Sequence, residues 1–298
     1  MHNHNIESDN KQIRFVTKLG ILGNFVLSAV KVVVGILAGS IALIADGIHS
    51  LSDMATDFAV LLGVYFGSKQ PDKNHPYGHG RIETFASVFI ALVLVLGGMA
   101  MIYYAAVDIT KGHIKTAHTA VLVVAVISII SKEFLYRVTK KVAIKTHSSA
   151  LYANAWHHRS DALSSVAVVI GFVSLKAGFG YGDQIAAIAV GLMIILVGVR
   201  VLGDCLRELT ESAIDSHTVE RIENIINANS SIRQWHKLRT RTVGREVFLD
   251  LHILVEPELD VAAAHEIAES LESALHEQIT RPVNVTVHIE PDMPELRK

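Results

Sequence analysis

The sequence has 298 residues, of which 50% are hydrophobic and 19% are charged, and its formal net charge is −2. A mean hydropathy of +0.38 excludes a disordered chain, and a single Cys excludes a disulfide scaffold. The lack of a basic excess argues against a nucleic-acid-binding protein. The 16 His residues are unusual in so apolar a chain and indicate a chemical use for imidazole.

Long apolar stretches alternate with short charged clusters over the first 211 residues. Crossing a bilayer as a helix takes about 20 residues, and several stretches are long enough. We predict six membrane-spanning helices, at residues 15–37, 42–66, 82–104, 120–135, 151–173 and 185–206, the fourth continuing as a helix beyond the bilayer. Because the polar N-terminus lacks a short apolar run followed by small residues, we expect no cleavable signal peptide.

The distribution of Lys and Arg around these spans predicts their orientation. One side of the membrane receives ten: Lys11, Arg14, Lys18, Lys69, Lys73, Arg81, Arg137, Lys140, Lys141 and Lys145. The other side receives three: Lys111, Lys115 and Lys176. Since positive residues near span ends are retained in the cytoplasm, both termini are predicted to be cytoplasmic. We expect the membrane to be a bacterial inner membrane.

Ionisable side chains mark the second and fifth spans. At spacings of 3, 4 and 4 residues, four side chains of the second span form one helical stripe: Asp46, His49, Asp53 and Asp57. Four polar side chains share about one face of the fifth span: Asn154, His157, His158 and Asp161. Ionisable groups are costly at membrane depth, so both stripes indicate a functional site.

Each of these spans contains a His and an Asp four residues apart, His49 with Asp53 and His157 with Asp161. Two such helices side by side offer two imidazoles and two carboxylates, a four-coordinate shell that suits Zn²⁺. Buried hydrogen bonds between helices and a proton relay are the alternatives. Three further residues keep open roles, as accessory ligands or structural partners: Asp46, Asp57 and His158.

Residues 212–298 have the composition of a soluble domain, because they hold 24 of the 56 Asp, Glu, Lys and Arg residues. With the C-terminus in the cytoplasm this domain is cytoplasmic, and residues 1–211 form the membrane domain. The hydrophobic periodicity of the cytoplasmic domain predicts a helix, two strands, a helix and a strand, at residues 217–229, 232–243, 246–256, 262–277 and 283–290. We therefore expect a membrane α-helical protein with a small α+β cytoplasmic domain of ferredoxin-like αββαβ order.

Three segments carry a family resemblance. They are Ala45-Asp46-Gly47-Ile48-His49-Ser50-Leu51-Ser52-Asp53, Asn74-His75-Pro76-Tyr77-Gly78-His79-Gly80 and Trp156-His157-His158-Arg159-Ser160-Asp161. Together they resemble the motifs of the cation diffusion facilitator family of metal/proton antiporters, and the resemblance covers nearly the whole chain. It implies a homodimer in the lipid bilayer that exports divalent metal ions by alternating access.

The resemblance also implies three groups of metal ligands. The transport site matches His49, Asp53, His157 and Asp161, and a loop site matches Asp72, His75 and His79. A site in the cytoplasmic domain matches His236, His252, His265, His288 and Glu290. Three departures from the family pattern leave open whether this last site holds two metals, one or none. They are Glu290 for an Asp, Ile289 for a polar neighbour and Lys237 for an acid.

These features predict export of Zn²⁺ from the cytoplasm in exchange for protons. An enzyme is not expected, because four ligands close the zinc shell and leave no open position for a substrate. A nucleotide partner is not expected, because there is no Walker-type phosphate loop. His49 resembles the zinc-selective vesicular members, and efflux of iron(II), cobalt, cadmium or manganese is the alternative. A non-transporting membrane metal sensor is the rival of a different class, although it would need no ionisable residues in two spans.

Overall fold

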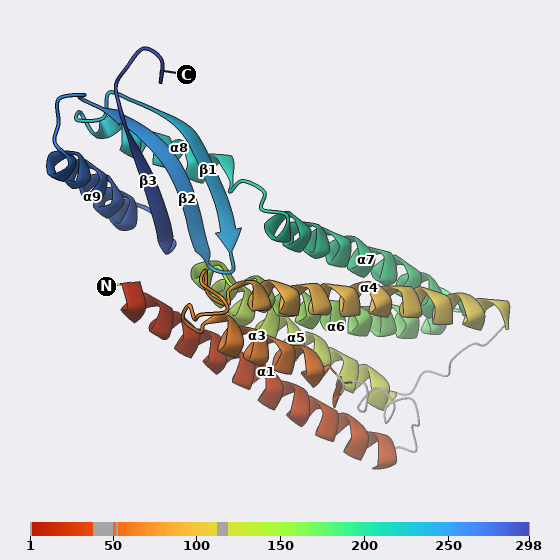
Figure 1. Ribbon diagram of the computed structural model, residues 1–298. Helices are drawn as coiled ribbons and strands as arrows, with labels where there is room; N and C mark the ends of the chain where they lie inside the picture. The colour runs from red at the N-terminus through yellow and green to blue at the C-terminus, as the bar shows by residue number, and fades with distance from the viewer. Residues whose placement is uncertain (1, 38–49, 52, 112–118, 298) are drawn as a thin grey trace. The chain divides into compact units, whose positions relative to one another are not determined.

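The computed structural model describes residues 2–37, 50–51, 53–111 and 119–297. The chain forms two compact units, Asn3–Cys205 and Leu206–Lys298. Figure 1 shows the first as a set of long helices and the second as a small sheet accompanied by two helices. A helical membrane part followed by a small domain with three strands is therefore confirmed.

Over its described residues the helical unit contains helices at each of the six predicted spans. They are α1 (His2–Leu37), α3 (Met54–Gly67), α4 (Arg81–Thr110), α5 (Thr119–Thr146), α6 (Ser149–Lys176) and α7 (Gly182–Leu209). Residues 38–49 and 52 lie outside the described residues, so α3 is the described remainder of the second span. The first 211 residues contain only two prolines, Pro71 and Pro76, and both lie in the loop between α3 and α4.

In the described part of the chain, three helical segments are long and apolar enough to cross a membrane. They are Ser8–Val34, Arg81–Thr110 and Gln184–Leu209, and Met54–Gly67 is a shorter apolar helix. Helices α5 and α6 are comparably long and carry ionisable residues near their midpoints, Lys132 and Asp161. The presence of apolar membrane helices is thus confirmed, and the full number of six stays a prediction.

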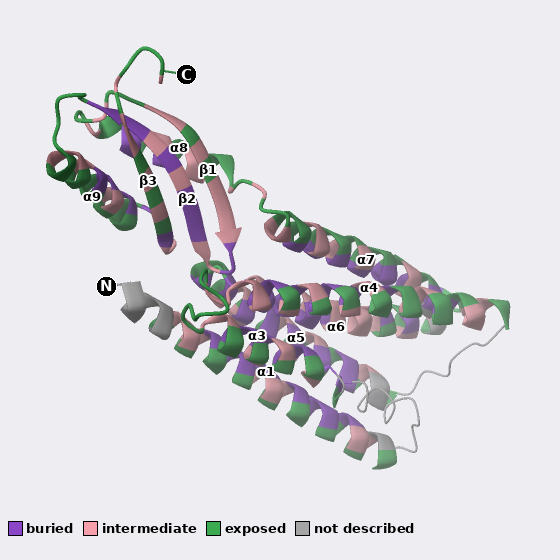
Figure 2. Cartoon of the chain, in the orientation of Figure 1, coloured by how far each residue is buried: buried purple, intermediate pink, exposed green. Residues whose placement is uncertain are grey.

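Many large apolar side chains of the helical unit face outward. Leu62, Phe89, Leu96 and Leu196 are all between 47% and 71% exposed. Figure 2 shows exposed residues recurring along the outer sides of α1, α4 and α7. A monomeric soluble protein rarely exposes so much apolar surface, whereas a helix surrounded by lipid requires it.

Glycines allow α4 and α7 to touch backbone to backbone. A Cβ added at Gly98 of α4 would lie 2.8 Å from the carbonyl oxygen of Gly191, and one at Gly191 would lie 2.9 Å from the carbonyl oxygen of Gly98. A second close approach involves Gly198 of α7, where a Cβ would lie 3.2 Å from the carbonyl oxygen of Ala91. Small residues at such positions are the usual means by which membrane helices pack closely.

The second unit has the predicted αββαβ order. Its elements are α8 (Ser216–Ala228), β1 (Gln234–Val243), β2 (Glu246–Val255), α9 (Val261–Gln278) and β3 (Val283–Pro291). The sheet order is β1-β2-β3, with β1 antiparallel and β3 parallel to β2. The helix α9 is the crossover that a parallel pair requires.

The core of this unit lies on one face of the sheet. Leu249, Leu251 and Ile253 of β2 are at most 1% exposed and cluster with apolar residues of α8 and α9 such as Ile226 and Leu275. Because side chains alternate along a strand, residues between these positions point to the opposite face. His252 is one of them, and it pairs in register with His236 of β1 and His288 of β3.

Candidate metal centres

Three predicted transport ligands lie together inside the helical unit. Asp53, immediately before α3, and His157 and Asp161, one turn apart on α6, place their ligand atoms within 4.8 Å of one another. Nε2 of His157 is 3.7 Å from Oδ1 of Asp53 and 3.9 Å from Oδ1 of Asp161. His49, the fourth predicted ligand, lies outside the described residues.

The geometry of this group suits a metal ion better than a hydrogen-bonded contact. Nitrogen and oxygen atoms that share a tetrahedral Zn²⁺ at about 2.0–2.1 Å lie about 3.3 Å apart. The observed separations exceed this by a few tenths of an ångström, and they exceed hydrogen-bond length. Both ring nitrogens of His157 are buried, and neither has a hydrogen-bond partner among the residues that the structure describes. A buried, unsatisfied imidazole is unusual and fits a ligand position.

A lysine that sequence reasoning missed lies beside this group. Lys132 of α5 is 2% exposed, and its Nζ lies 2.6 Å from Oδ2 of Asp161 and 2.6 Å from Oδ1 of Asn24 on α1. The sequence feature that could have indicated Lys132 is the presence of a lysine inside the predicted fourth span. It lies three residues from the predicted end of that span, Leu135, where a lysine side chain ordinarily extends to the interface instead.

Asp57 and His158, whose roles the sequence left open, belong to a hydrogen-bonded network next to the transport group. Asp57 is fully buried, and its carboxylate accepts hydrogen bonds from Nδ2 of Asn154 at 2.7 Å and from Nδ2 of Asn24 at 2.9 Å. Nε2 of His158 lies 3.7 Å from Oδ1 of Asp57. We call Asn24, Asp57, Asn154 and His158 the polar network. Asp46 lies outside the described residues.

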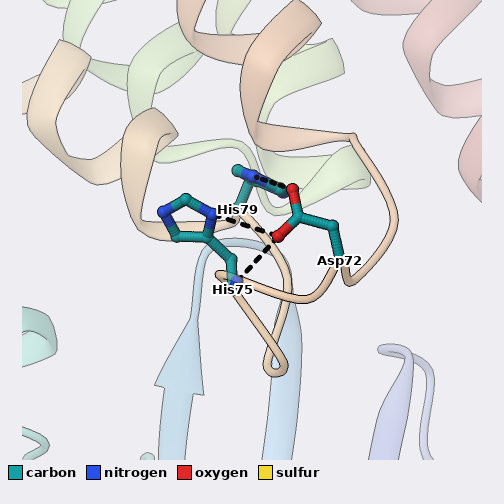
Figure 3. A group of neighbouring side chains, drawn as sticks. All are labelled: Asp72, His75 and His79. Atoms are coloured by element: carbon teal, nitrogen blue, oxygen red, sulfur yellow. Dashed lines mark hydrogen bonds and ion pairs between the residues drawn. The ribbon is translucent and has the colours of Figure 1, made fainter.

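The predicted loop ligands Asp72, His75 and His79 also come together, between α3 and α4 (Figure 3). Oδ1 of Asp72 lies 3.3 Å from Nδ1 of His75, and its Oδ2 lies 3.4 Å from Nε2 of His79. The backbone N–H of His75 donates to Oδ1 of Asp72 at 2.7 Å, and this bond is the main reason that the pKa of Asp72 is below its ordinary value. An ionised carboxylate facing two imidazoles can hold a divalent cation.

In the second unit, one residue from each strand builds the cluster of His236, His252 and Glu290. Nδ1 of His252 lies 2.7 Å from Oε1 of Glu290, and Nε2 of His236 lies 3.1 Å from its Oε2. His288 is 62% exposed, and its Nε2 lies 3.5 Å from Oε1 of Glu290. The hydrogen bond with His252 is the largest cause of the lowered pKa of Glu290, and burial opposes it.

This cluster fits a metal ion, because Nε2 of His236 and Oε2 of Glu290 are buried and, although 3.1 Å apart, make no well-aligned hydrogen bond with each other or with any other described residue. Glu290, which stands where an Asp was expected, reaches both imidazoles with one carboxylate. His265, the fifth predicted residue, is not part of this cluster within the chain. It lies on α9, is 68% exposed and has its Nε2 3.4 Å from Oε1 of Glu269.

Comparison with known proteins identifies both units. Residues 17–210 match the family model of the cation efflux transmembrane domain, and residues 214–292 match that of the cation efflux protein cytoplasmic domain. An uncharacterized transporter of Methanocaldococcus jannaschii is 36% identical over 272 residues, which are 91% of this chain and 96% of that protein.

Two further similarities extend the comparison. The manganese efflux system protein MneP of Bacillus subtilis is 29% identical over 292 residues, 95% of this chain and 98% of that protein. Among solved structures, a nickel form of the CTD of MamM is 31% identical and covers 25% of this chain and 99% of that chain, with a TM-score of 0.23.

Proposed function

This chain belongs to the cation diffusion facilitator family of cation efflux proteins, and on that premise we propose that it exports Zn²⁺ from the cytoplasm in exchange for protons. The observation that carries the proposal is the buried group of Asp53, His157 and Asp161. It combines two carboxylates with a buried imidazole that makes no hydrogen bond to any described residue, which is a donor set suited to a metal ion. We propose His49, four residues before Asp53 in the sequence, as the fourth ligand.

The choice of zinc rests on the donor atoms. Two imidazoles and two carboxylates suit Zn²⁺, whereas an all-oxygen shell would suit manganese better. The relative MneP is named for manganese efflux, which makes manganese the first competing ion to test. Iron(II), cobalt and cadmium are further candidate ions for the same fold. Competition among these ions for transport decides between them.

Exchange follows from the chemistry of the ligands. Carboxylates and imidazoles bind a metal only when deprotonated, so metal binding releases protons and protonation expels the metal. An imidazole ordinarily titrates near neutral pH, which makes His49 and His157 the natural exchange groups. In this proposal six membrane helices alternate between inward-open and outward-open forms around one set of ligands. Both termini lie in the cytoplasm, and the membrane is the bacterial inner membrane.

The domain boundary lies at residues 211 and 212 in this proposal, and the cytoplasmic domain joins two chains into a homodimer. His236, His252, His288 and Glu290 would hold a metal there, with His265 as a further predicted ligand. A bound cation would replace the contacts among these side chains with coordination bonds and favour the transport-competent dimer. Asp72, His75 and His79 would hold a further ion in the loop.

Zinc uptake into proteoliposomes with an imposed pH gradient tests the function. Asp161→Asn removes one charged ligand and should abolish zinc flux. Asp204→Asn, an exposed acid on α7, is the matched control and should transport like the wild type. If Asp161→Asn transports as well as the control, the proposed pocket is wrong.

The rival of a different class, a membrane metal sensor, has its own outcome in the same assay. The exposed side of the cluster around His288 is the feature that favours it, because a sensor needs an accessible site. A sensor would bind zinc through Glu290 and its neighbours yet carry no flux under any gradient.

A further inference from the structure

Lys132 places its side-chain ammonium against the proposed transport site. Its Nζ lies 2.6 Å from Oδ2 of Asp161, while Oδ1 of the same carboxylate faces Nε2 of His157 at 3.9 Å. The carboxylate of Asp161 is therefore shared between an ammonium on one side and the proposed metal position on the other. A charged hydrogen bond of this length in a buried place is a strong contact.

A second contact fixes the lysine from the opposite side. Nζ of Lys132 also lies 2.6 Å from Oδ1 of Asn24, and the amide nitrogen of Asn24 donates to Asp57 at 2.9 Å. The chain of contacts thus runs from Asp57 on α3 through α1 and α5 to Asp161 on α6. The lysine is part of a connected cluster and its position is set by four helices.

The formal charge of that cluster matches the charge of the metal ion that we propose it carries. Among the described residues that these contacts link, there are three carboxylates, Asp53, Asp57 and Asp161, and one ammonium, Lys132, which leaves a formal charge of −2. One divalent cation neutralises it. Without the lysine the same cluster would carry −3 and would hold a divalent cation more strongly.

We propose that Lys132 is a built-in counter-cation that positions Asp161 and weakens metal binding enough for the metal to leave. This inference rests on the proposed transport function and adds a residue that sets affinity and release. While the metal is absent, the ammonium satisfies Asp161. When the metal binds, Asp161 is shared, and repulsion between the two cations keeps the complex reversible.

The test measures zinc affinity and flux in the full-length protein in lipid nanodiscs and proteoliposomes at one fixed pH. Zinc binding at the membrane site is obtained by difference, as the part of the total zinc binding that is lost in Asp161→Asn. Lys132→Met and Lys132→Gln both remove the charge, and the Gln variant keeps groups that can hydrogen-bond Asn24 and Asp161. Lys132→Arg keeps the charge, and Lys18→Gln removes one from an exposed position on α1.

We expect Lys132→Met and Lys132→Gln to lower the zinc Kd of the membrane site at least tenfold and to slow flux at saturating zinc at least threefold. Lys132→Arg and Lys18→Gln should stay within about threefold of the wild-type Kd. A purely structural lysine predicts the opposite sign, weaker binding after its removal. Unchanged or weaker binding in both neutral variants overturns the inference. If the wild type shows no binding that depends on Asp161, the proposed function itself fails.

Discussion

Gly20 of α1 lies against the polar network, and its replacement by Ala tests how tightly that network is held. A Cβ at Gly20 would lie 3.1 Å from Oδ1 of Asp57 and 3.3 Å from Nε2 of His158. Gly23 on the same helix is a matched control, since a Cβ there would lie 3.2 Å from the methyl carbon Cδ1 of Leu135. Both substitutions gain about the same helix propensity, roughly 1 kcal/mol. The difference in stability between the two variants therefore reports the effect of the new methyl group on its neighbours.

The two contacts differ in what can move. Asp57 is held by hydrogen bonds of 2.7 and 2.9 Å, so it can give way by a few tenths of an ångström only by distorting them. Overpacking of this kind costs about 1–3 kcal/mol. The methyl groups of Leu135 can move away by rotation about the side-chain bonds. We therefore expect Gly20→Ala to be less stable than Gly23→Ala by about 1–3 kcal/mol.

Thermal unfolding of the full chain in detergent, followed by zinc flux in proteoliposomes, measures both consequences. Gly20→Ala should unfold at a lower temperature than Gly23→Ala and should transport more slowly, because Asp57 is linked through Asn24 and Lys132 to Asp161. Equal unfolding temperatures together with equal flux would refute the reasoning.

Three further predictions concern the metal choice, the cytoplasmic cluster and pH. His49→Asp should raise cadmium flux relative to zinc flux in proteoliposomes, because the second span would then supply two carboxylates and the more acidic site would discriminate less against cadmium. An unchanged flux ratio contradicts the preference for zinc. Glu290→Gln should weaken zinc binding by the cytoplasmic cluster at least tenfold in calorimetric titration of the full chain, because it removes the carboxylate that two imidazoles share, whereas the exposed Glu295→Gln should not. Asp215 caps α8 by accepting a hydrogen bond from the backbone N–H of Thr218 at 2.9 Å, and Asp215→Ala should cost the second unit about 1 kcal/mol. Partial burial opposes ionisation of Asp215, but the bonds from Thr218 outweigh it and hold its pKa below the ordinary value. Its contribution is therefore full above pH of about 4 and is lost as the pH falls through the folded-state pKa, so acid unfolding should show a smaller pH dependence in Asp215→Asn than in the wild type.

The fold could be predicted where one pattern dominates. Apolar runs placed the helices, and strict alternation placed β2 and β3, because burial on one face of a sheet selects every second residue. The parallel pairing of β3 with β2 was not predicted, because a period of two is the same in both directions. The spacing of His157 and Asp161 predicted that they share a helix face, which the structure shows.

The neighbours of the site were harder to predict, because they come from other helices. Asn24 on α1 and Lys132 on α5 have no spacing relation to Asp161, and only packing brings them to 2.6 Å from each other. His265 shows the reverse case, a residue expected with the cytoplasmic cluster that lies on α9 beside Glu269. Residue type indicates what a side chain can bind, and tertiary contacts decide whether it is near enough.

The glycine contacts between α4 and α7 have a consequence for the motions available to the proposed transporter. Gly98 with Gly191 and Gly198 with Ala91 bring the two backbones close at two levels, so a displacement of one helix along the other would bring larger side chains into these contacts. We expect the pair to move as one unit. In the proposed transport cycle we therefore expect the change between inward-open and outward-open forms to alter the contacts among α1, α3, α5 and α6, where the polar side chains lie.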